Sequence, residues 1–169
     1  TTTQGCIAFA PVFYYLLQKW QPEEILRGTP PQSPKNKIIA LPASAGEILQ
    51  LDSLFQHHNA KADLYLRRTA SESAVKSGIL ENYRYVHFAT HGIINDDNPD
   101  FSGLLLLRDS LSANDGKLYA SEIYNLKLRA DLVVLSACES GLGKLIEGEG
   151  LVGLSRSFLY AGATNLSVS

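Results

Sequence analysis

Short hydrophobic runs alternate with longer amphipathic segments along most of the chain. A run of about four to eight apolar residues is typical of a buried strand, whereas apolar residues three and four apart are typical of a helix on a core. The strand-like runs are 37–41, 62–66, 83–89, 131–137 and 166–168. The helix-like segments are 46–58, 69–80, 120–126 and 150–161. This alternation predicts an α/β fold with a mostly parallel central sheet and helices on both of its faces.

Local signals predict where some of these elements begin and end. Thr69 with Glu72 three residues later matches a capping box, so we expect the helix over 69–80 to begin at Thr69 and to close near Leu80. The apolar stretch 101–107 suits an arm of a small hairpin, and Asp115-Gly116 is a turn signal.

The first 37 residues differ from the rest. Residues 6–20 are apolar and aromatic and are interrupted at Pro11, which favours an edge strand followed by a short helix. Residues 21–37 contain four prolines and are expected to form an exposed loop. We therefore predict an N-terminal segment over 1–37 and one domain over 38–169. The chain opens without Met and stops in a strand-like run, so we expect it to be a piece of a longer polypeptide.

Composition excludes several classes of function. The formal net charge of −2 gives no basic surface for nucleic acid, and no apolar run approaches the roughly 20 residues of a membrane span. The apolar stretch 7–17 includes Pro11 and lacks a basic flank, so we do not expect it to be an export signal. Cys6 and Cys138 are therefore expected to be free thiols in a reducing compartment, the cytoplasm.

No motif for a metal or a cofactor is complete, and we expect none to be bound. Cysteine and histidine do not follow the spacing of a zinc site. Gly141-Leu142-Gly143-Lys144 resembles a phosphate loop, but Leu145 stands where that loop requires Ser or Thr.

Two of the predicted strands end at a reactive side chain. The run 85–90 is followed by His91-Gly92, and the run 132–137 is followed by Cys138. Catalytic groups of open parallel sheets lie beyond the carboxyl ends of the strands. If the two strands are neighbours, His91 and Cys138 meet at one edge, as a cysteine peptidase requires.

The chemistry of this pair is plain, although each residue alone has a structural explanation. A thiol attacks a carbonyl as the thiolate, and a nearby imidazole can take its proton and later protonate the leaving amine. The N–H groups of Gly92 and Cys138 are candidate oxyanion donors. A lone Cys138 would be interpreted as a small buried hydrophobe, and His87 as a core histidine that shares a face with Ala89.

Acidic residues near the pair are candidates for substrate recognition. Glu139 could bind a basic group of a substrate, although a solvated loop acid is the simpler interpretation. The run 95–100 could bind a cation, but its Asn, Asp and Pro residues favour a polar turn.

These motifs together resemble a known family. The motifs are YVHFATHG at 85–92, VVLSACESGLG at 133–143, GEG at 148–150 and FLYAGA at 158–163. They look like a CHAT domain, a family of caspase-like cysteine peptidases related to separase and metacaspases. The resemblance implies a caspase-like three-layer sandwich with a His91–Cys138 dyad. It also implies tetratricopeptide repeats upstream of Thr1, which would gate the protease or recruit substrates.

The resemblance also implies a substrate pocket. In such relatives the residue two before the catalytic Cys often lines the pocket for the substrate residue that precedes the cut. Here that residue is Ser136, where metacaspases carry an acid, so a metacaspase-style preference for basic residues does not follow from it.

We therefore expect a cysteine endopeptidase domain that cleaves a protein or peptide substrate. The alternative is a non-proteolytic caspase-like signalling or scaffold module that keeps the fold and binds partners. A third hypothesis is a flavodoxin-like receptor with an apolar pocket and a buried, unreactive Cys138.

Overall fold

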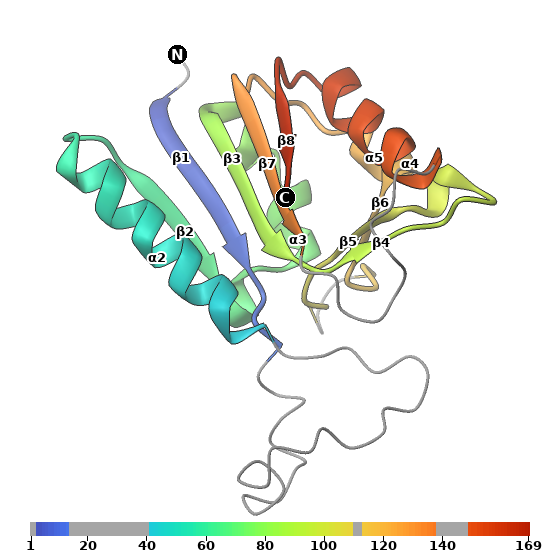
Figure 1. The fold of residues 1–169 in the computed structure, drawn as a ribbon, viewed down its shortest axis with the longest axis horizontal. Coiled ribbons are helices and arrows are strands. Elements are labelled where there is room, and N and C mark those ends of the chain that lie inside the picture. The colour runs from blue at the N-terminus through green and yellow to red at the C-terminus, as the bar shows by residue number, and fades with distance from the viewer. Residues whose placement is uncertain (1–2, 14–40, 110–112, 138–148) are drawn as a thin grey trace, which may run out of the picture.

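A five-stranded parallel sheet forms the centre of the protein in a computed structural model, which describes residues 3–13, 41–109, 113–137 and 149–169. Its strands are β1 (Thr3–Ala10), β2 (Ala62–Leu66), β3 (Tyr83–Thr90), β7 (Leu132–Ala137) and β8 (Leu166–Val168). They lie in the order β2-β1-β3-β7-β8, and every neighbouring pair is parallel (Figure 1). The predicted mostly parallel sheet is confirmed.

Helices cover both faces of this sheet. Side chains alternate between the two faces of a strand, so Ala8 and Ala10 lie opposite Ile7 and Phe9. The face of Ala8 and Ala10 packs against Ile48 of α2 (Pro42–His57). The opposite face packs against residues of α3 (Glu72–Lys76), α4 (Ala120–Ile123) and α5 (Glu149–Tyr160). The predicted three-layer α/β architecture is therefore confirmed (Figure 1). None of the helices in the described part of the chain is long and apolar enough to cross a membrane.

A second, smaller sheet follows directly after β3. Its strands β4 (Gly92–Ile93), β5 (Gly103–Leu105) and β6 (Lys117–Tyr119) are antiparallel. The predicted turn at Asp115-Gly116 precedes β6, and Gly116 has a φ of 87°, a backbone conformation that favours glycine. Figure 1 shows this sheet beside the lower, carboxyl ends of β3 and β7. It therefore lies where the candidate catalytic groups were predicted.

Strand β1 is a correction to the sequence analysis, which expected an edge strand. It lies between β2 and β3 and is covered on both faces of the sheet, so Cys6 to Ala10 are all buried. The central sheet thus includes a strand that precedes residue 38. The short helix expected after Pro11 lies outside the described residues, as does 37–40. Leu41, the last residue of that predicted strand, is instead the N-cap of α2.

The start of α3 is a second correction. Ser71, not Thr69, is the N-cap, and its Oγ accepts a hydrogen bond of 3.2 Å from the Ala74 N–H. Thr69 belongs to a 3₁₀ turn (Arg67–Thr69), where its hydroxyl donates to the carbonyl of Leu66. Glu72 does not complete a capping box, since its buried carboxylate accepts from the Gly116 N–H at 2.7 Å. Further 3₁₀ turns lie at Ile79–Asn82 and Pro99–Phe101.

Candidate active site at the carboxyl edge of the sheet

Strands β3 and β7 are direct neighbours, as the dyad hypothesis requires. Their parallel register runs from Tyr85↔Leu132 to Thr90↔Ala137. The last paired residues, Thr90 and Ala137, therefore lie side by side at the carboxyl edge. His91 and Cys138 are the next residues in the sequence. Cys138 and Glu139 lie outside the described residues, so the dyad itself stays a prediction.

The backbone around His91 is fixed by the small sheet. The Thr90 hydroxyl donates a hydrogen bond to the carbonyl oxygen of Leu105, and the Leu105 N–H donates to the carbonyl oxygen of His91 at 2.9 Å. Both contacts join the end of β3 to β5. Because a catalytic base has to be held in place, this double attachment suits the role predicted for His91.

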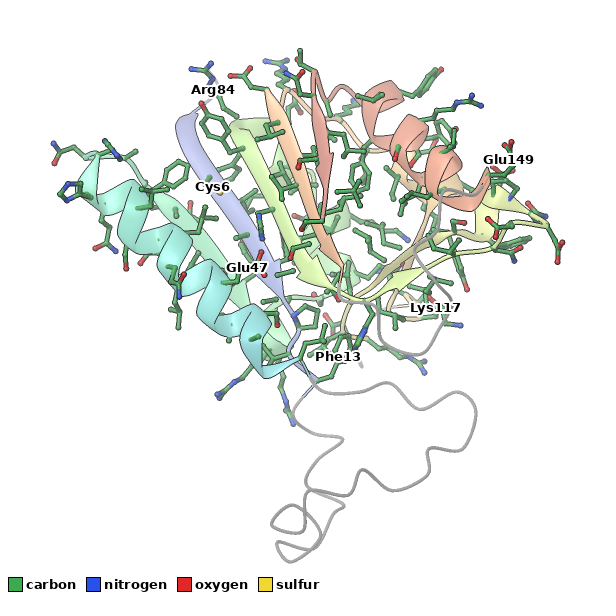
Figure 2. All side chains as sticks on the ribbon, viewed as in Figure 1. Cys6, Phe13, Glu47, Arg84, Lys117 and Glu149 are labelled. Carbon is green, nitrogen blue, oxygen red and sulfur yellow. The ribbon has the colours of Figure 1, made fainter. Side chains whose placement is uncertain are left out.

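The His91 ring is packed inside the protein. Its residue is 1 % exposed, and the ring centroid lies 5.3 Å from that of Phe13 at an interplanar angle of 36°. Phe13 follows β1 and is itself buried (Figure 2). Any reaction at His91 therefore takes place in surroundings shielded from water, where electrostatic interactions are stronger than in solvent.

Gly92, the predicted oxyanion donor, begins β4. It pairs with Leu104 of β5 and is half-buried. The glycine therefore belongs to the same small sheet that fixes His91. Its role as an oxyanion donor is a prediction that this placement leaves open.

Ser136, the predicted pocket residue, lies on the face of the sheet that α2 covers. It pairs with Ala89, which packs in the core beneath α2. Its hydroxyl donates to Glu47 Oε2 at 3.1 Å. Glu47 Oε1 lies 3.0 Å from Nε2 of His87, so one carboxylate of α2 joins β3 to β7. His87 is buried and shares a face with Ala89, as predicted.

Glu47 is the residue that the sequence analysis missed. It stands within the predicted helix 46–58, next to the buried Ile48, as one acid among apolar neighbours. An acid beside the buried position of an amphipathic helix is the only signal in the sequence. Its partners lie 40 and 89 residues away, and such contacts follow from tertiary packing alone.

The acidic run 95–100 forms the predicted polar turn. Asn95 Oδ1 accepts from the Asn98 N–H at 2.8 Å, and Asp96 Oδ1 accepts from the Gly150 N–H at 3.1 Å. The segment after His91 is thus bound to the start of α5. In the described part of the chain, no group of three or more His, Cys, Asp or Glu side chains is arranged to hold a metal ion.

The thiol of Cys6 is expected to be unreactive. Cys6 lies in β1 and is 1 % exposed, and burial raises the pKa of its thiol to about 12. A thiol with so high a pKa is almost entirely protonated at neutral pH and is a poor nucleophile. Of the two cysteines, Cys6 is therefore excluded as the nucleophile.

Comparison with known proteins gives one family. The family model described as the CHAT domain matches residues 26–169. Among curated proteins, none matches the chain. The match spans every strand of the described structure except β1, and its caspase-like α/β architecture agrees with the three layers described above.

Proposed function

The chain belongs to the CHAT domain family of caspase-like cysteine peptidase relatives, and on that basis we propose that it is a cysteine endopeptidase domain with Cys138 as nucleophile and His91 as general base and acid. Its substrate is the peptide bond of a protein. The N–H groups of Gly92 and Cys138 bind the oxyanion, and Ser136 and Glu139 line the pocket for the residue before the cut.

The reaction proceeds in two halves. The Cys138 thiolate attacks the carbonyl carbon of the scissile bond, so an S–C bond forms and negative charge collects on the carbonyl oxygen. The C–N bond then breaks as His91 donates its proton to the leaving amine. Water, deprotonated by His91, attacks the thioester and releases the new carboxylate and the free thiol.

The observation that carries this proposal is the register of β3 and β7. Thr90 and Ala137 are the last partners in the ladder, and neighbouring strands lie about 4.8 Å apart. His91 and Cys138 follow those two residues directly. If β3 and β7 were shifted by one residue against each other, or were not neighbours, the register would no longer support pairing His91 with Cys138.

Labelling with an electrophilic peptidyl probe tests the proposal. We expect covalent modification at Cys138 and not at Cys6, read by peptide mapping. Cys138→Ala should abolish labelling, and His91→Ala should slow it by about a hundredfold or more, because the thiolate is no longer stabilised by a neighbouring imidazole. His58→Ala is the matched control, since His58 is exposed at the end of α2. Equal labelling of wild type and His91→Ala contradicts the proposal.

One observation favours the alternative of a non-proteolytic binding module. His91 is 1 % exposed, as a structural histidine would be. That alternative predicts that Cys138→Ala leaves partner binding and cellular function intact. The resemblance further supports upstream tetratricopeptide repeats as the partner that recruits substrates. The cytoplasm is the proposed compartment because the cysteines are expected to be free thiols.

A further inference from the structure

Glu47 differs from the other paired carboxylates of the described structure in the kind of partner it has. Its side chain contacts His87 and Ser136, at 3.0 Å and 3.1 Å, and is 40 % exposed. Figure 2 shows it between α2 and the sheet. The other acids in ion pairs each have a lysine or arginine beside them: Asp63, Glu72, Glu81, Glu122 and Asp131. Among the described residues, no such cation lies within ion-pair distance of Glu47.

The contacts of Glu47 leave its carboxylate able to accept further hydrogen bonds. A carboxylate oxygen accepts hydrogen bonds, so the contact with His87 is a hydrogen bond in the tautomer that carries a proton on Nε2. The two oxygens have about four acceptor positions between them, and His87 and Ser136 occupy one each. The remaining positions can accept from a further donor without breaking either contact.

The place of this carboxylate links it to the proposed reaction. Residues two apart in a strand share a face, and Ser136 is two residues before Cys138. Ser136 is the last residue of β7 on the face that α2 covers. The Glu47 carboxylate accepts its hydrogen bond, and so lies beside the predicted pocket. Ser136 is neutral, but the group hydrogen-bonded to it is an acid.

We propose that Glu47 is a specificity-determining residue that gives the site a preference for Arg or Lys immediately before the scissile bond. This inference rests on the proposed function. The carboxylate accepts hydrogen bonds from the guanidinium or ammonium group, and such charge-assisted bonds are about twice as strong as neutral ones. Ser136 is neutral where metacaspases carry an acid. Here the carboxylate comes from Glu47 of α2, a segment far away in the sequence.

Matched probes separate charge from size. Three acyloxymethyl ketone probes carry lysine, norleucine or glutamate next to the warhead; norleucine keeps the length of lysine without the ammonium group. The rate of Cys138 labelling is measured for each on the full 1–169 chain. We expect wild type to react with the lysine probe about tenfold faster than with the norleucine probe.

Three variants assign that preference. Glu47→Gln keeps the size of the side chain but removes its charge, and it should reduce the lysine-to-norleucine ratio severalfold. Ser136→Ala removes the hydroxyl but keeps the charge, so the preference should persist. Asp52→Asn is the control, because it makes the same charge change on the same helix, where Asp52 accepts only from Gln56 among the described residues.

The outcomes distinguish this inference from the proposed function. Cys138 labelling with the same ratio in wild type and Glu47→Gln, or a wild-type preference for norleucine or glutamate, overturns the role of Glu47 and leaves the peptidase in place. A failure of every probe to label Cys138 in folded wild type overturns both. A thermal melt of each variant confirms that the rates compare folded proteins.

Discussion

Thr90 and Ala137 are the last paired residues of the parallel β3–β7 ladder. The two strands end at the same level of the sheet, and His91 and Cys138 are the next residues in the sequence. The small sheet lies next to this edge, because β4 begins two residues after β3 ends. The ends of β3 and β7 and the small sheet therefore meet at one edge, and the described contacts of that edge can be tested one at a time.

The first prediction concerns the hydrogen bond of Thr90. Thr90→Val keeps the shape of the side chain but removes the donor to the Leu105 carbonyl, so the residue before His91 is held less firmly. We expect kcat/KM for a cleaved peptide to fall by about tenfold or more. Thr69→Val is the matched control, because Thr69 makes the same kind of bond to Leu66 at an exposed site. Equal activity of both variants contradicts the positioning role.

The second prediction concerns the join between the segment after His91 and α5. A Cβ on Gly150 would lie 2.7 Å from Ser102 Oγ and 2.9 Å from the Asn95 carbonyl oxygen. Gly150→Ala should therefore displace the start of α5 and destabilise the protein by about 1–3 kcal/mol, measured by urea unfolding.

Gly46→Ala is the control for this substitution. Gly46 lies in α2 with nothing within 4 Å of an added Cβ, so alanine should stabilise the helix by about 0.5–1 kcal/mol. Destabilisation of equal size at both positions would show that the contacts around Gly150 are not the cause.

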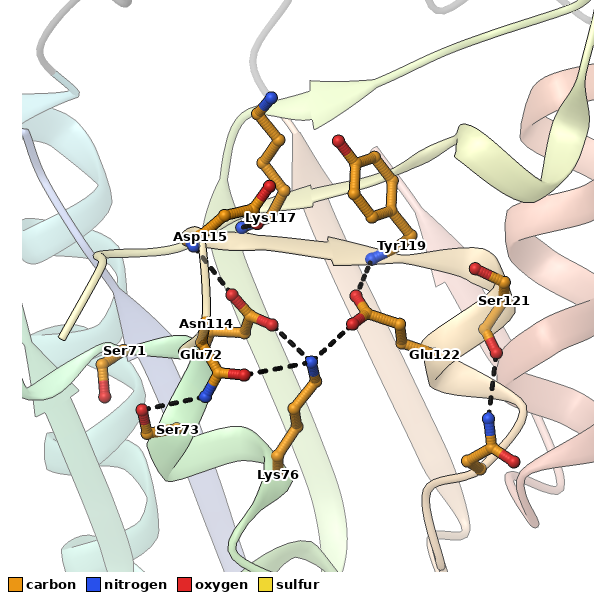
Figure 3. Close-up of polar contacts among 12 residues, drawn as sticks. Ser71, Glu72, Ser73, Lys76, Asn114, Asp115, Lys117, Tyr119, Ser121 and Glu122 are labelled. Carbon is orange, nitrogen blue, oxygen red and sulfur yellow. Dashed lines mark hydrogen bonds and ion pairs between the residues drawn. The ribbon is translucent and has the colours of Figure 1, made fainter. Parts of the chain in front are cut away.

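The third prediction concerns the polar cluster that binds α3 to the small sheet. Lys76 Nζ contacts Glu72 and lies 2.6 Å from Glu122 Oε1, while Glu72 also accepts from the Gly116 N–H (Figure 3). Burial alone would lower the pKa of Lys76, but hydrogen bonds to Glu122 and Glu72 outweigh it and raise the pKa. The lysine therefore stays charged at neutral pH.

Lys76→Met leaves the Glu72 carboxylate, whose side chain is 2 % exposed, without its cation. We expect a loss of about 2 kcal/mol in the free energy of unfolding, less than the roughly 3–5 kcal/mol for a fully buried pair, because Lys76 is partly exposed. Lys61→Met is the control. Lys61 is 79 % exposed in its pair with Asp63, and its loss should cost about 0.5 kcal/mol or less. Similar losses at both sites would contradict the role of burial.

The fourth prediction concerns pH and the buried thiol of Cys6. Its pKa rises from 9.0 to about 12 on folding, so above pH 9 the unfolded chain releases this proton while the folded chain keeps it. Stability from this group is complete below pH 9 and decreases as the pH rises toward 12. The slope for one proton approaches about 1.4 kcal/mol per pH unit.

Cys6→Ala isolates this contribution. The variant should be less stable than wild type at pH 7, because a buried group is lost, and the difference should shrink between pH 9 and 11. Chemical denaturation at each pH measures it. A difference that stays constant over this range would show that the Cys6 thiol ionises equally in both states.

Much of this fold could be predicted from the pattern of apolar residues, and the exceptions have physical reasons. β3 and β7 are largely apolar runs, so their existence and parallel direction followed from parallel-sheet rules, whereas their pairing as neighbours was a condition that the structure meets. β1 looked like an edge strand because Pro11 ends it, yet Ala8 and Ala10 are small enough to let α2 lie directly over it. Thr69 and Ser71 are both possible caps, and only the tertiary position of Glu72 beside Gly116 decides between them.

The candidate site divides in the same way. His91 and Gly92 were found because they follow an apolar run, whereas Ser136 was predicted only from the resemblance to a known family. Glu47 was missed because its contacts with His87 and Ser136 depend on how α2 crosses the sheet. A charged residue within one helix carries no local sign of such distant partners.

Cleavage of a proteome-derived peptide library by the 1–169 chain, read as new peptide termini by mass spectrometry, tests the central claim most directly. Wild type should generate a set of termini that share a preference at the residue before the cut. Cys138→Ala and His91→Ala should generate none above background, and Cys6→Ala should generate the wild-type set. Termini that persist in Cys138→Ala, or a folded wild-type chain that cleaves no peptide, would contradict the account of this protein as a cysteine peptidase.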